Sequence, residues 1–187
     1  TCPAGVEIDC RQLGAKRVKS LTDYGTATIQ DMCLDTVWID SISMLGQCLV
    51  GDLIRKINAK DKAGNVSSCE QIIKVVNNDP FDPYDTADFE WPRDTTFFIC
   101  AAVTTPSVTG MPKIKDLGCS KVAFDFVDEI YQFAPGACKK ILRKWSVVDW
   151  CQVEPTVPKS GRWVRTQAIV VMDTIKPVIT VPANFTV

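Results

Sequence analysis

The chain has 187 residues, of which 46% are hydrophobic, and its 21 basic and 22 acidic side chains leave a net charge of −1. This balance excludes the basic footprint of a nucleic-acid-binding protein, and no run of about 18 apolar residues predicts a membrane span. There are nine cysteines and no histidines. The missing imidazoles argue against the common hydrolases and catalytic zinc sites, and the cysteines, with no CxxC pair, indicate disulfides in an oxidising compartment.

Taken in chain order, the sequence contains one unit twice, with a period of about 90 residues. Residues 1–78 form the first predicted repeat, residues 79–90 an acidic, proline-containing linker, and residues 91–175 the second repeat. Residues 176–187 are predicted to begin a third, because "ITVPANFTV" resembles the opening "TCPAGVEI". The aligned cysteines are Cys10, Cys33 and Cys48 in the first copy and Cys100, Cys119 and Cys138 in the second. We therefore expect a segment of a longer tandem array.

Strand-like segments follow one another through each repeat. The clearest are rich in β-branched and aromatic residues and are separated by proline and glycine, at residues 97–103, 122–127, 140–148 and 167–173. No segment has a sustained helical period. About seven short strands per repeat predict an all-β fold of tandem immunoglobulin-like β-sandwich domains, disulfide-stapled. Ile57 and Trp145 share one repeat position, and both are expected in the core.

Comparison of the two copies predicts one disulfide directly. Cys2 and Cys69 occur only in the first copy, where the second copy has Trp91 and Arg165. Because the two cysteines are lost together, we predict that they are bonded to each other. Such a bond would close most of the domain and contribute roughly 4–5 kcal/mol in the chain-entropy model.

The remaining cysteines are assigned by their distribution over the copies. Two pairs present in both copies close short loops of similar size and are predicted to be local, and Cys151, whose counterpart is Ala63, is left for a cysteine of its own repeat. Cys10 then has no partner, and it is a free thiol, a buried unreactive thiol, or a cysteine bonded to a neighbouring chain or repeat. The predicted pairs are Cys33–Cys48, Cys119–Cys138 and Cys100–Cys151.

The sequence also resembles a known class of repeats. The segment "AKDKAGNVSSCEQIIKVVNND" resembles the "TDxxGNxxxCxQxIxVxD" ending of hyalin-repeat (HYR) domains. The segments "WPRDTTFFIC", "TGMP" and "ILRKWSVVDWC" resemble immunoglobulin-like repeats of giant Bacteroidota surface adhesins, such as the gliding-motility adhesins exported by type IX secretion. The second copy departs from the hyalin pattern where Trp150-Cys151-Gln152 replaces the turn at Gly64-Asn65. The resemblance implies a β-sandwich, a cell-surface location, a role in adhesion, stalk or filament formation, and no enzymatic activity.

The linker contains a candidate calcium site. Ca²⁺ takes six to eight oxygen ligands, and spaced carboxylates between two domains could supply them, although the spacing matches no EF-hand loop. The alternative is a solvated linker stiffened by Pro80, Pro83 and Pro92. The candidate ligands are Asp79, Asp82, Asp85 and Asp88.

Short Asp-Ser/Thr motifs are candidate sites of bacterial O-glycosylation. In each, an aliphatic residue or Thr follows the hydroxyl residue, the pattern that O-glycans of Bacteroidota occupy. The candidates are Thr36, Ser41, Thr86, Thr95 and Thr174. Asn65 and Asn184 fit the N-glycan sequon, which matters only in a host with that pathway.

Two further patterns have structural interpretations. Arg55 and Asp61 recur as Arg143 and Asp149, but six strand residues span about 20 Å, so each arginine is expected to contact neighbouring strands or turn backbone instead. Phe133, Trp150 and Trp163 would form either a sugar-binding platform or ordinary packing, and Trp163 lies in the longer loop of the second copy.

Together these observations predict a non-enzymatic structural repeat segment of an extracellular bacterial adhesin, stalk or surface filament. Its expected partners are flanking repeats of the same polypeptide, identical chains in a filament, and surface glycans. One alternative is a carbohydrate-binding or spacer module of a secreted enzyme. Another is a filament subunit that donates the strand at 179–187 to its neighbour.

Overall fold

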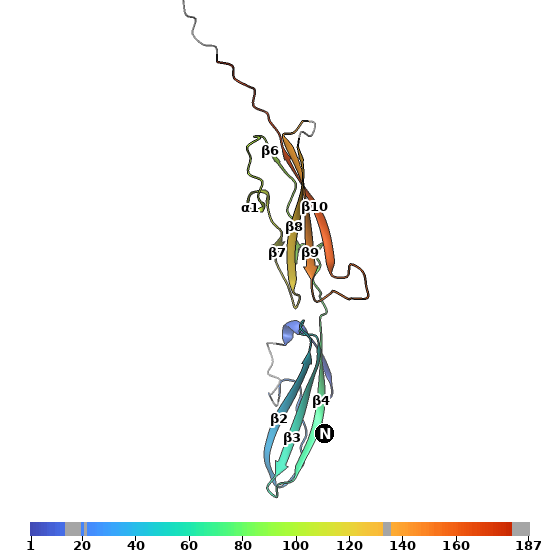
Figure 1. Cartoon of the computed structure of the whole chain (residues 1–187). Coiled ribbons are helices and arrows are strands. Elements are labelled where there is room, and N and C mark those ends of the chain that lie inside the picture. Colours follow the sequence, from blue (N-terminus) through green and yellow to red (C-terminus); the bar gives the residue numbers. More distant parts are fainter. Residues whose placement is uncertain (14–19, 21, 133–135, 181–187) are drawn as a thin grey trace, which may run out of the picture. The chain divides into compact units, whose positions relative to one another are not determined.

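A computed structural model describes residues 1–13, 20, 22–132 and 136–180 and divides the chain into two compact units (Figure 1). Unit 1 consists of Thr1–Asp82 together with two loops, Asp116–Val122 and Asp149–Gly161. Unit 2 consists of Pro83–Lys115, Ala123–Val148 and Arg162–Val187. The first division, after Asp82, falls inside the predicted linker, but both loops of unit 1 come from the predicted second repeat.

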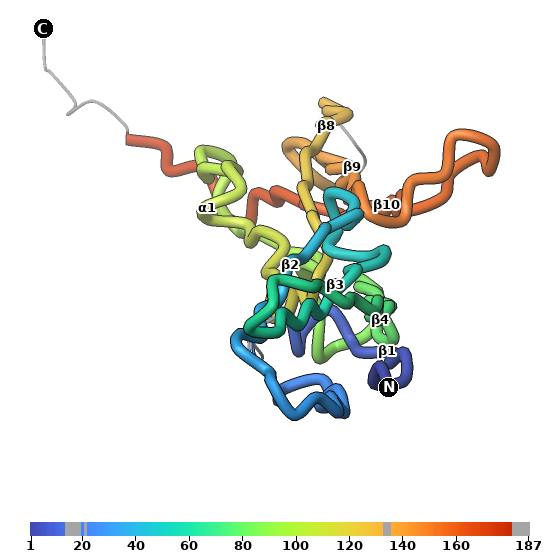
Figure 2. The backbone as a smooth tube through the Cα atoms, turned by 90° about the horizontal axis from the view of Figure 1, so that it is seen from below, coloured from blue at the N-terminus to red at the C-terminus, as the bar shows by residue number. Residues whose placement is uncertain are grey.

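Unit 1 is built on a four-stranded sheet with the order β1-β4-β3-β2 (Figure 2). Strand β1 pairs with β4 in parallel, and β3 pairs with both β4 and β2 in antiparallel orientation. A short 3-10 helix, η1, follows β1 directly, and Asp9 caps its first turn. The elements are β1 (Val6–Asp9), η1 (Cys10–Gln12), β2 (Leu34–Leu45), β3 (Gly51–Asp61) and β4 (Val66–Val76).

One face of this sheet is buried. Leu53, Ile73 and Val75 pack with Cys10 and Tyr24, which come from the segments covering that face. Because side chains alternate along a strand, the other face of β3 and β4 carries exposed charged residues such as Lys56, Glu70 and Lys74, together with exposed Val66 and Ile72.

Unit 2 repeats this topology with the order β6-β10-β9-β8. Again the short first strand pairs in parallel with the last, and the last pairs with its neighbour in antiparallel orientation. A two-stranded sheet of β5 and β7 belongs to the segment that precedes β8. The elements are β5 (Phe89–Glu90), β6 (Thr95–Phe97), α1 (Pro106–Thr109), β7 (Lys113–Ile114), β8 (Val122–Gln132), β9 (Lys139–Asp149) and β10 (Arg162–Val171).

The core of unit 2 is more aromatic than that of unit 1. Trp145 is almost fully buried on β9, and the rings of Phe124 and Phe126 lie 6.1 and 5.1 Å from it. Ile57 is buried at the equivalent position of unit 1, so the prediction that both residues lie in the core is confirmed. In the second layer, Phe89 packs edge-on against Trp91 with ring centroids 5.0 Å apart.

The predicted all-β, immunoglobulin-like fold class is confirmed, with fewer and longer strands than expected among the described residues. Strands β2, β3 and β4 have 11 or 12 residues each, and the predicted strand 97–103 is wrong beyond Phe97, where the chain turns. Residues 176–180 form no strand, and most of the predicted donor strand lies outside the described residues. No helix in the described part of the chain is long and apolar enough to cross a membrane.

Candidate functional site

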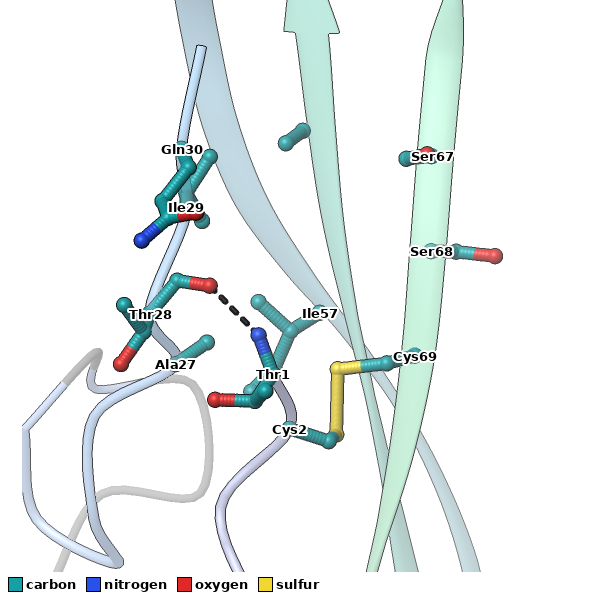
Figure 3. A pocket seen from close by; sticks show the side chains of 11 residues that line it. Thr1, Cys2, Ala27, Thr28, Ile29, Gln30, Ile57, Ser67, Ser68 and Cys69 are labelled. Atoms are coloured by element: carbon teal, nitrogen blue, oxygen red, sulfur yellow. Dashed lines mark hydrogen bonds between the residues drawn. A yellow bond between two sulfur atoms is a disulfide. The ribbon is translucent and has the colours of Figure 1, made fainter.

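The first disulfide joins Cys2 to Cys69, the pair that the two copies predict (Figure 3). It connects the segment before β1 to the middle of β4. The N-terminal ammonium of Thr1 donates to the carbonyl of Thr28, and the Thr28 N–H donates back to the carbonyl of Thr1. Residues 1–2 are therefore held to β4 by a covalent bond and to the segment before β2 by a reciprocal pair of hydrogen bonds.

The other three disulfides differ from the sequence-based prediction. In the structure Cys10 is bonded to Cys119, Cys48 to Cys151, and Cys100 to Cys138. Cys33, rather than Cys10, is the free cysteine, and it is exposed. Two of these bonds connect a cysteine of the first repeat to one of the second. Four disulfides in the described residues are typical of extracellular or secreted proteins.

Strand length explains why the predicted local pairs are wrong. Strand β2 separates Cys33 from Cys48, and its 12 residues span roughly 40 Å, far beyond the Cα separation of about 6 Å that a disulfide requires. Strand β8 separates Cys119 from Cys138 in the same way. The two cysteines of each predicted pair are close in the sequence but therefore lie at opposite ends of the sheet.

The same geometry explains the pairing of Cys100. Strand β6 pairs with the end of β10, Phe97 opposite Val171, and Val171 is opposite the first residue of β9. Cys138 precedes β9 at that end of the sheet, whereas Cys151 follows β9 at the other end. Cys100 is consequently close to Cys138 and not to its predicted partner Cys151.

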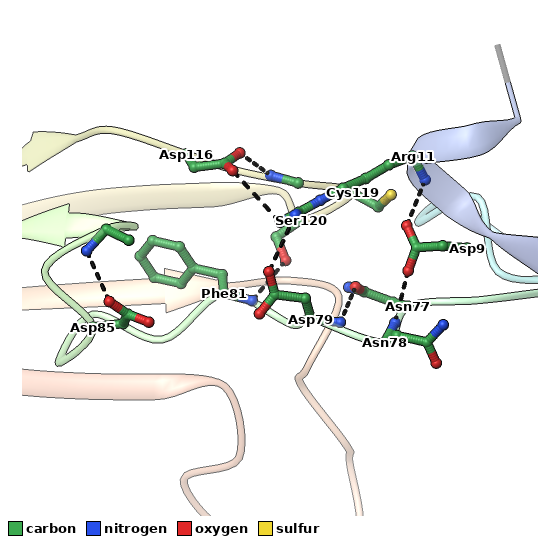
Figure 4. Close-up of polar contacts among 12 residues, drawn as sticks. Asp9, Arg11, Asn77, Asn78, Asp79, Phe81, Asp85, Asp116, Cys119 and Ser120 are labelled. Carbon is green, nitrogen blue, oxygen red and sulfur yellow. Dashed lines mark hydrogen bonds and ion pairs between the residues drawn. The ribbon is translucent and has the colours of Figure 1, made fainter. Parts of the chain in front are cut away.

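Cys119, the partner of Cys10, lies close to the ion pairs of Arg11 (Figure 4). Arg11, the residue after Cys10, forms ion pairs with Asp79 at 3.1 Å and with Asp116 at 3.6 Å. Gly118, the residue before Cys119, has a positive φ of 51°, and a Cβ there would lie 2.7 Å from the Arg11 guanidinium. Glycine suits the positive φ at this position, and it lets the guanidinium lie directly against the loop.

Asp149 organises the loop that carries Cys151. Its fully buried carboxylate accepts hydrogen bonds from the backbone N–H groups of Lys121 and Cys151 and from the side-chain amide of Gln152. The same amide of Gln152 donates to the carbonyl of Phe81. A buried carboxylate with three donors fixes both loops of unit 1 around the disulfides.

The prediction for the arginine–aspartate repeat is confirmed. Buried Arg143 binds both carboxylate oxygens of Asp128 on the neighbouring strand β8, and buried Arg55 donates to Gln71 on β4 and to the carbonyl of Ser20. Burial lowers the pKa of Arg55 from its ordinary value. Neither arginine contacts the aspartate of its own strand.

The predicted calcium ligands are engaged in other contacts. Asp79 is paired with Arg11, the Asp85 carboxylate accepts the N–H of Ala87, and Asp88 is buried. Asp82 is exposed. Among the described residues, the sets of three ligand atoms within 4.8 Å contain none of these four acids, and each set includes both sulfurs of a disulfide. Calcium at the linker stays a prediction that the described contacts do not favour.

The candidate modification sites differ in accessibility. Thr36 and Ser41 on β2, Thr86 and Thr174 are exposed, whereas Thr95 is half-buried and its hydroxyl contacts backbone carbonyls. Asn65 donates its side-chain amide to Asp61, and Asn184 lies outside the described residues. Accessibility therefore permits glycosylation at four of the five O-glycan candidates.

The aromatic candidates of the sequence do not line the aromatic pocket of unit 2. Trp150 is exposed and Trp163 is half-buried on β10, while Phe133 lies outside the described residues. A separate pocket of about 440 Å³ lies in unit 2 and includes Tyr84 and Trp91. Its charged lining residues are Glu90, Arg93, Lys115 and Arg165.

This pocket combines aromatic rings with cationic groups. The guanidinium of Arg165 lies 5.9 Å from the ring centroid of Trp91, and the ammonium of Lys115 is 3.7 Å from Glu90. The buried indole Nε1 of Trp91 has no hydrogen-bond partner among the described residues. Sequence comparison identified Trp91 and Arg165 only as replacements for a disulfide, so the pocket was missed.

Comparison with known proteins gives little additional information. No protein-family model and no curated protein matches the chain. Among solved structures, it is similar to the crystal structure of human mucin-like protocadherin EC1-2, with 9% sequence identity and a TM-score of 0.32, over 91% of this chain and 97% of that one.

Proposed function

We propose that the chain is a non-enzymatic structural segment of an extracellular bacterial adhesin, stalk or surface filament, built from tandem immunoglobulin-like, hyalin-repeat-like domains of the kind found in giant Bacteroidota adhesins. The observation that supports this role most strongly is the pair of inter-repeat disulfides, Cys10–Cys119 and Cys48–Cys151. A protein that only displays a binding site has no need to join successive repeats covalently.

The disulfides have a direct mechanical consequence. Cys10–Cys119 closes a span of 109 residues and Cys48–Cys151 a span of 103. When the chain ends are pulled, the disulfides carry the load, and most of the residues between the bonded cysteines are not stretched. The bonds also restrict the unfolded chain and thereby oppose unfolding and proteolysis. Both properties suit a segment that holds another domain away from a cell surface.

Force spectroscopy tests this role in a full chain with Cys2→Ser, Cys69→Ser, Cys100→Ser and Cys138→Ser, which keeps the two inter-repeat disulfides and removes the two bonds within repeats. Each extended residue adds roughly 3.5 Å, so reduction of the disulfides should lengthen the chain released on unfolding by hundreds of ångströms. Further replacement of Cys10, Cys48, Cys119 and Cys151 by Ser in the same background should release this length without reductant. Equal released lengths before and after reduction would show that the repeats are not covalently joined and would contradict the proposal.

The pocket in unit 2 favours a carbohydrate-binding module as the second candidate. Its aromatic rings could stack on a sugar, and its cationic side chains would select an acidic one. Saturable binding of a soluble acidic oligosaccharide by the full chain, weakened by Tyr84→Ala and Arg93→Gln but not by the exposed control Arg162→Gln, would support it. Absence of binding in a glycan screen would leave the structural role alone.

A further inference from the structure

In the two inter-repeat disulfides, the cysteines of the first repeat lie at one end of the repeat's sheet and those of the second repeat lie at the opposite end. Cys10 and Cys48 lie at the end of the unit 1 sheet where β4 ends, because Asp9 is opposite Val76 and Gly51 is opposite Val75. Their partners, Cys119 and Cys151, lie just before β8 and just after β9, which is the opposite end of a repeat's sheet. At this junction the first repeat therefore bonds forward from one end of its sheet, and the second repeat bonds backward from the opposite end of its own.

This arrangement leaves three of the aligned cysteines of the chain without an inter-repeat partner. Cys33 is equivalent to the backward-bonding Cys119, yet it is free and exposed. Cys100 and Cys138 are equivalent to the forward-bonding Cys10 and Cys48, yet they are bonded to each other. We infer that Cys33 forms an inter-repeat disulfide with Cys100 of a second copy of this chain. The inference deepens the structural role proposed above and rests on it.

The surface around Cys100 is suited to receive another repeat. A cavity of about 680 Å³, mostly apolar, is lined by Ile99, Cys100, Ala101, Ile175 and Val178 among others. The side chains of Ile99, Ile175 and Val178 are exposed. Around Cys33, the side chain of Met32 is fully exposed and that of Leu34 is partly exposed. Burial of these apolar groups against one another would stabilise the contact.

The residues beside the two cysteines are complementary in size. In the observed bond, large Arg11 next to Cys10 lies against small Gly118 next to Cys119. The equivalent positions carry small Ala101 next to Cys100 and large Met32 next to Cys33. The large and small residues have exchanged sides, which preserves the total volume at the junction. In the same alignment apolar Ile175 replaces Asp79, so an apolar contact takes the place of the Arg11 ion pair.

The bond can form without an added oxidant. The thiolate of Cys33 attacks the sulfur of Cys100, the Cys33–Cys100 bond forms, the Cys100–Cys138 bond breaks, and Cys138 leaves as a thiolate that takes a proton from water. One disulfide and one thiol are present before and after the step. Because the contact joins two different surfaces, it continues head to tail and gives a linear chain of copies.

The test is incubation of the oxidised full chain at millimolar concentration near the ordinary cysteine pKa of about 8.5, followed by non-reducing electrophoresis and peptide mapping. We expect a ladder of covalent oligomers that contain Cys33–Cys100 and a free Cys138. Cys33→Ser should abolish the ladder. The control Cys33→Ser/Ser43→Cys restores an exposed thiol elsewhere on β2 and should form no bond to Cys100.

The size exchange gives a second, independent test. Met32→Gly and Ala101→Arg should each slow oligomer formation by about tenfold, and the double variant should restore it, because it recreates the observed Arg11–Gly118 pairing. A monomeric product, a Cys33 bond to another cysteine, or an equally reactive Ser43→Cys control would overturn the inference. None of these results would affect the Cys10–Cys119 bond within one chain, so the structural role would remain separately testable.

Discussion

The two units differ in the interaction that links one pair of equivalent positions. In unit 1 the pair is Cys2 and Cys69, joined by a disulfide. In unit 2 it is Trp91 and Arg165, whose guanidinium lies 5.9 Å from the indole centroid. Both pairs connect the segment before the first strand to the last strand. The contact is therefore a fixed feature of the repeat, while its chemistry can change from a covalent bond to a cation–π interaction.

A second pair of positions is unchanged between the units. Gln71 is opposite Arg55 in the register of β3 and β4, and Gln167 is opposite Arg143 in that of β9 and β10. The amide of Gln71 donates to the carbonyls of Ala4 and Tyr24, and the amide of Gln167 to those of Arg93 and Thr109. These carbonyls occupy equivalent positions of the repeat. The buried glutamine thus connects the two layers in both units.

Removal of the unit 1 disulfide should have the largest effect on this comparison. Cys2→Ser/Cys69→Ser opens a span of 67 residues and should lower the free energy of unfolding of unit 1 by about 4 kcal/mol. Hydrogen exchange of β4 peptides measures the loss, with β10 peptides as the internal reference. An equal increase of exchange in β10 would contradict the assignment of the bond to unit 1 alone.

Replacement of the shared glutamines should have the next largest effect. Each of Gln71→Leu and Gln167→Leu removes two hydrogen bonds to backbone carbonyls. Gln71→Leu also removes the acceptor of buried Arg55, and Gln167→Leu that of the Trp145 indole. Each substitution should cost about 2–3 kcal/mol in its own unit. The exposed Gln30→Leu should change stability by less than about 0.5 kcal/mol. Denaturant unfolding monitored separately in the two units gives these values. A cost confined to one glutamine would show that the two networks are not equivalent.

Loss of the cation–π contact should be a smaller effect. Arg165→Gln should destabilise unit 2 by about 0.5–1 kcal/mol, well below the cost of the disulfide at the equivalent positions. Arg162→Gln, on the same strand and exposed, is the matched control. If both substitutions had the same effect in thermal unfolding, the contact with Trp91 would contribute nothing.

The smallest expected effect concerns pH at the turn after β3. Hydrogen bonds from the side chain and backbone of Asn65 lower the pKa of Asp61. Because the folded pKa is below the unfolded one, the stabilisation is present above the unfolded value and is lost as pH falls through the folded value. An NMR titration should find the Asp61 pKa below 3.8, and Asn65→Ala should return it towards 3.8. An unchanged titration in Asn65→Ala would refute the cause.

Internal comparison of the sequence could predict the features that one repeat contains by itself. The all-β fold, the core positions of Ile57 and Trp145, and the pairing of Cys2 with Cys69 all follow from the alignment of the two copies. Strand length correctly excluded the aspartate of the same strand as the partner of each repeated arginine. These features depend on residues that face one another within a single sheet or its covering layer.

The remaining cysteine pairs were predicted wrongly because each cysteine was assumed to bond within its own repeat. Cys33 and Cys48 recur together as Cys119 and Cys138, but they recur as the two ends of a strand and not as a bonded pair. The length of β2, indicated by the many β-branched and aromatic residues of "LDTVWIDSISML" and its lack of Pro and Gly, could have excluded the pair. No signal in a single repeat indicates that its cysteines bond to the next one.

Disulfide mapping of the oxidised, monomeric chain tests the central claim most directly. Cleavage between the cysteines without reduction, followed by mass spectrometry, should identify Cys10–Cys119 and Cys48–Cys151 and leave Cys33 free for alkylation. That result would establish covalent bonds between successive repeats. Recovery of Cys33–Cys48 and Cys119–Cys138 instead would show that each repeat is closed, and it would contradict both the structural role and the inferred bond between copies.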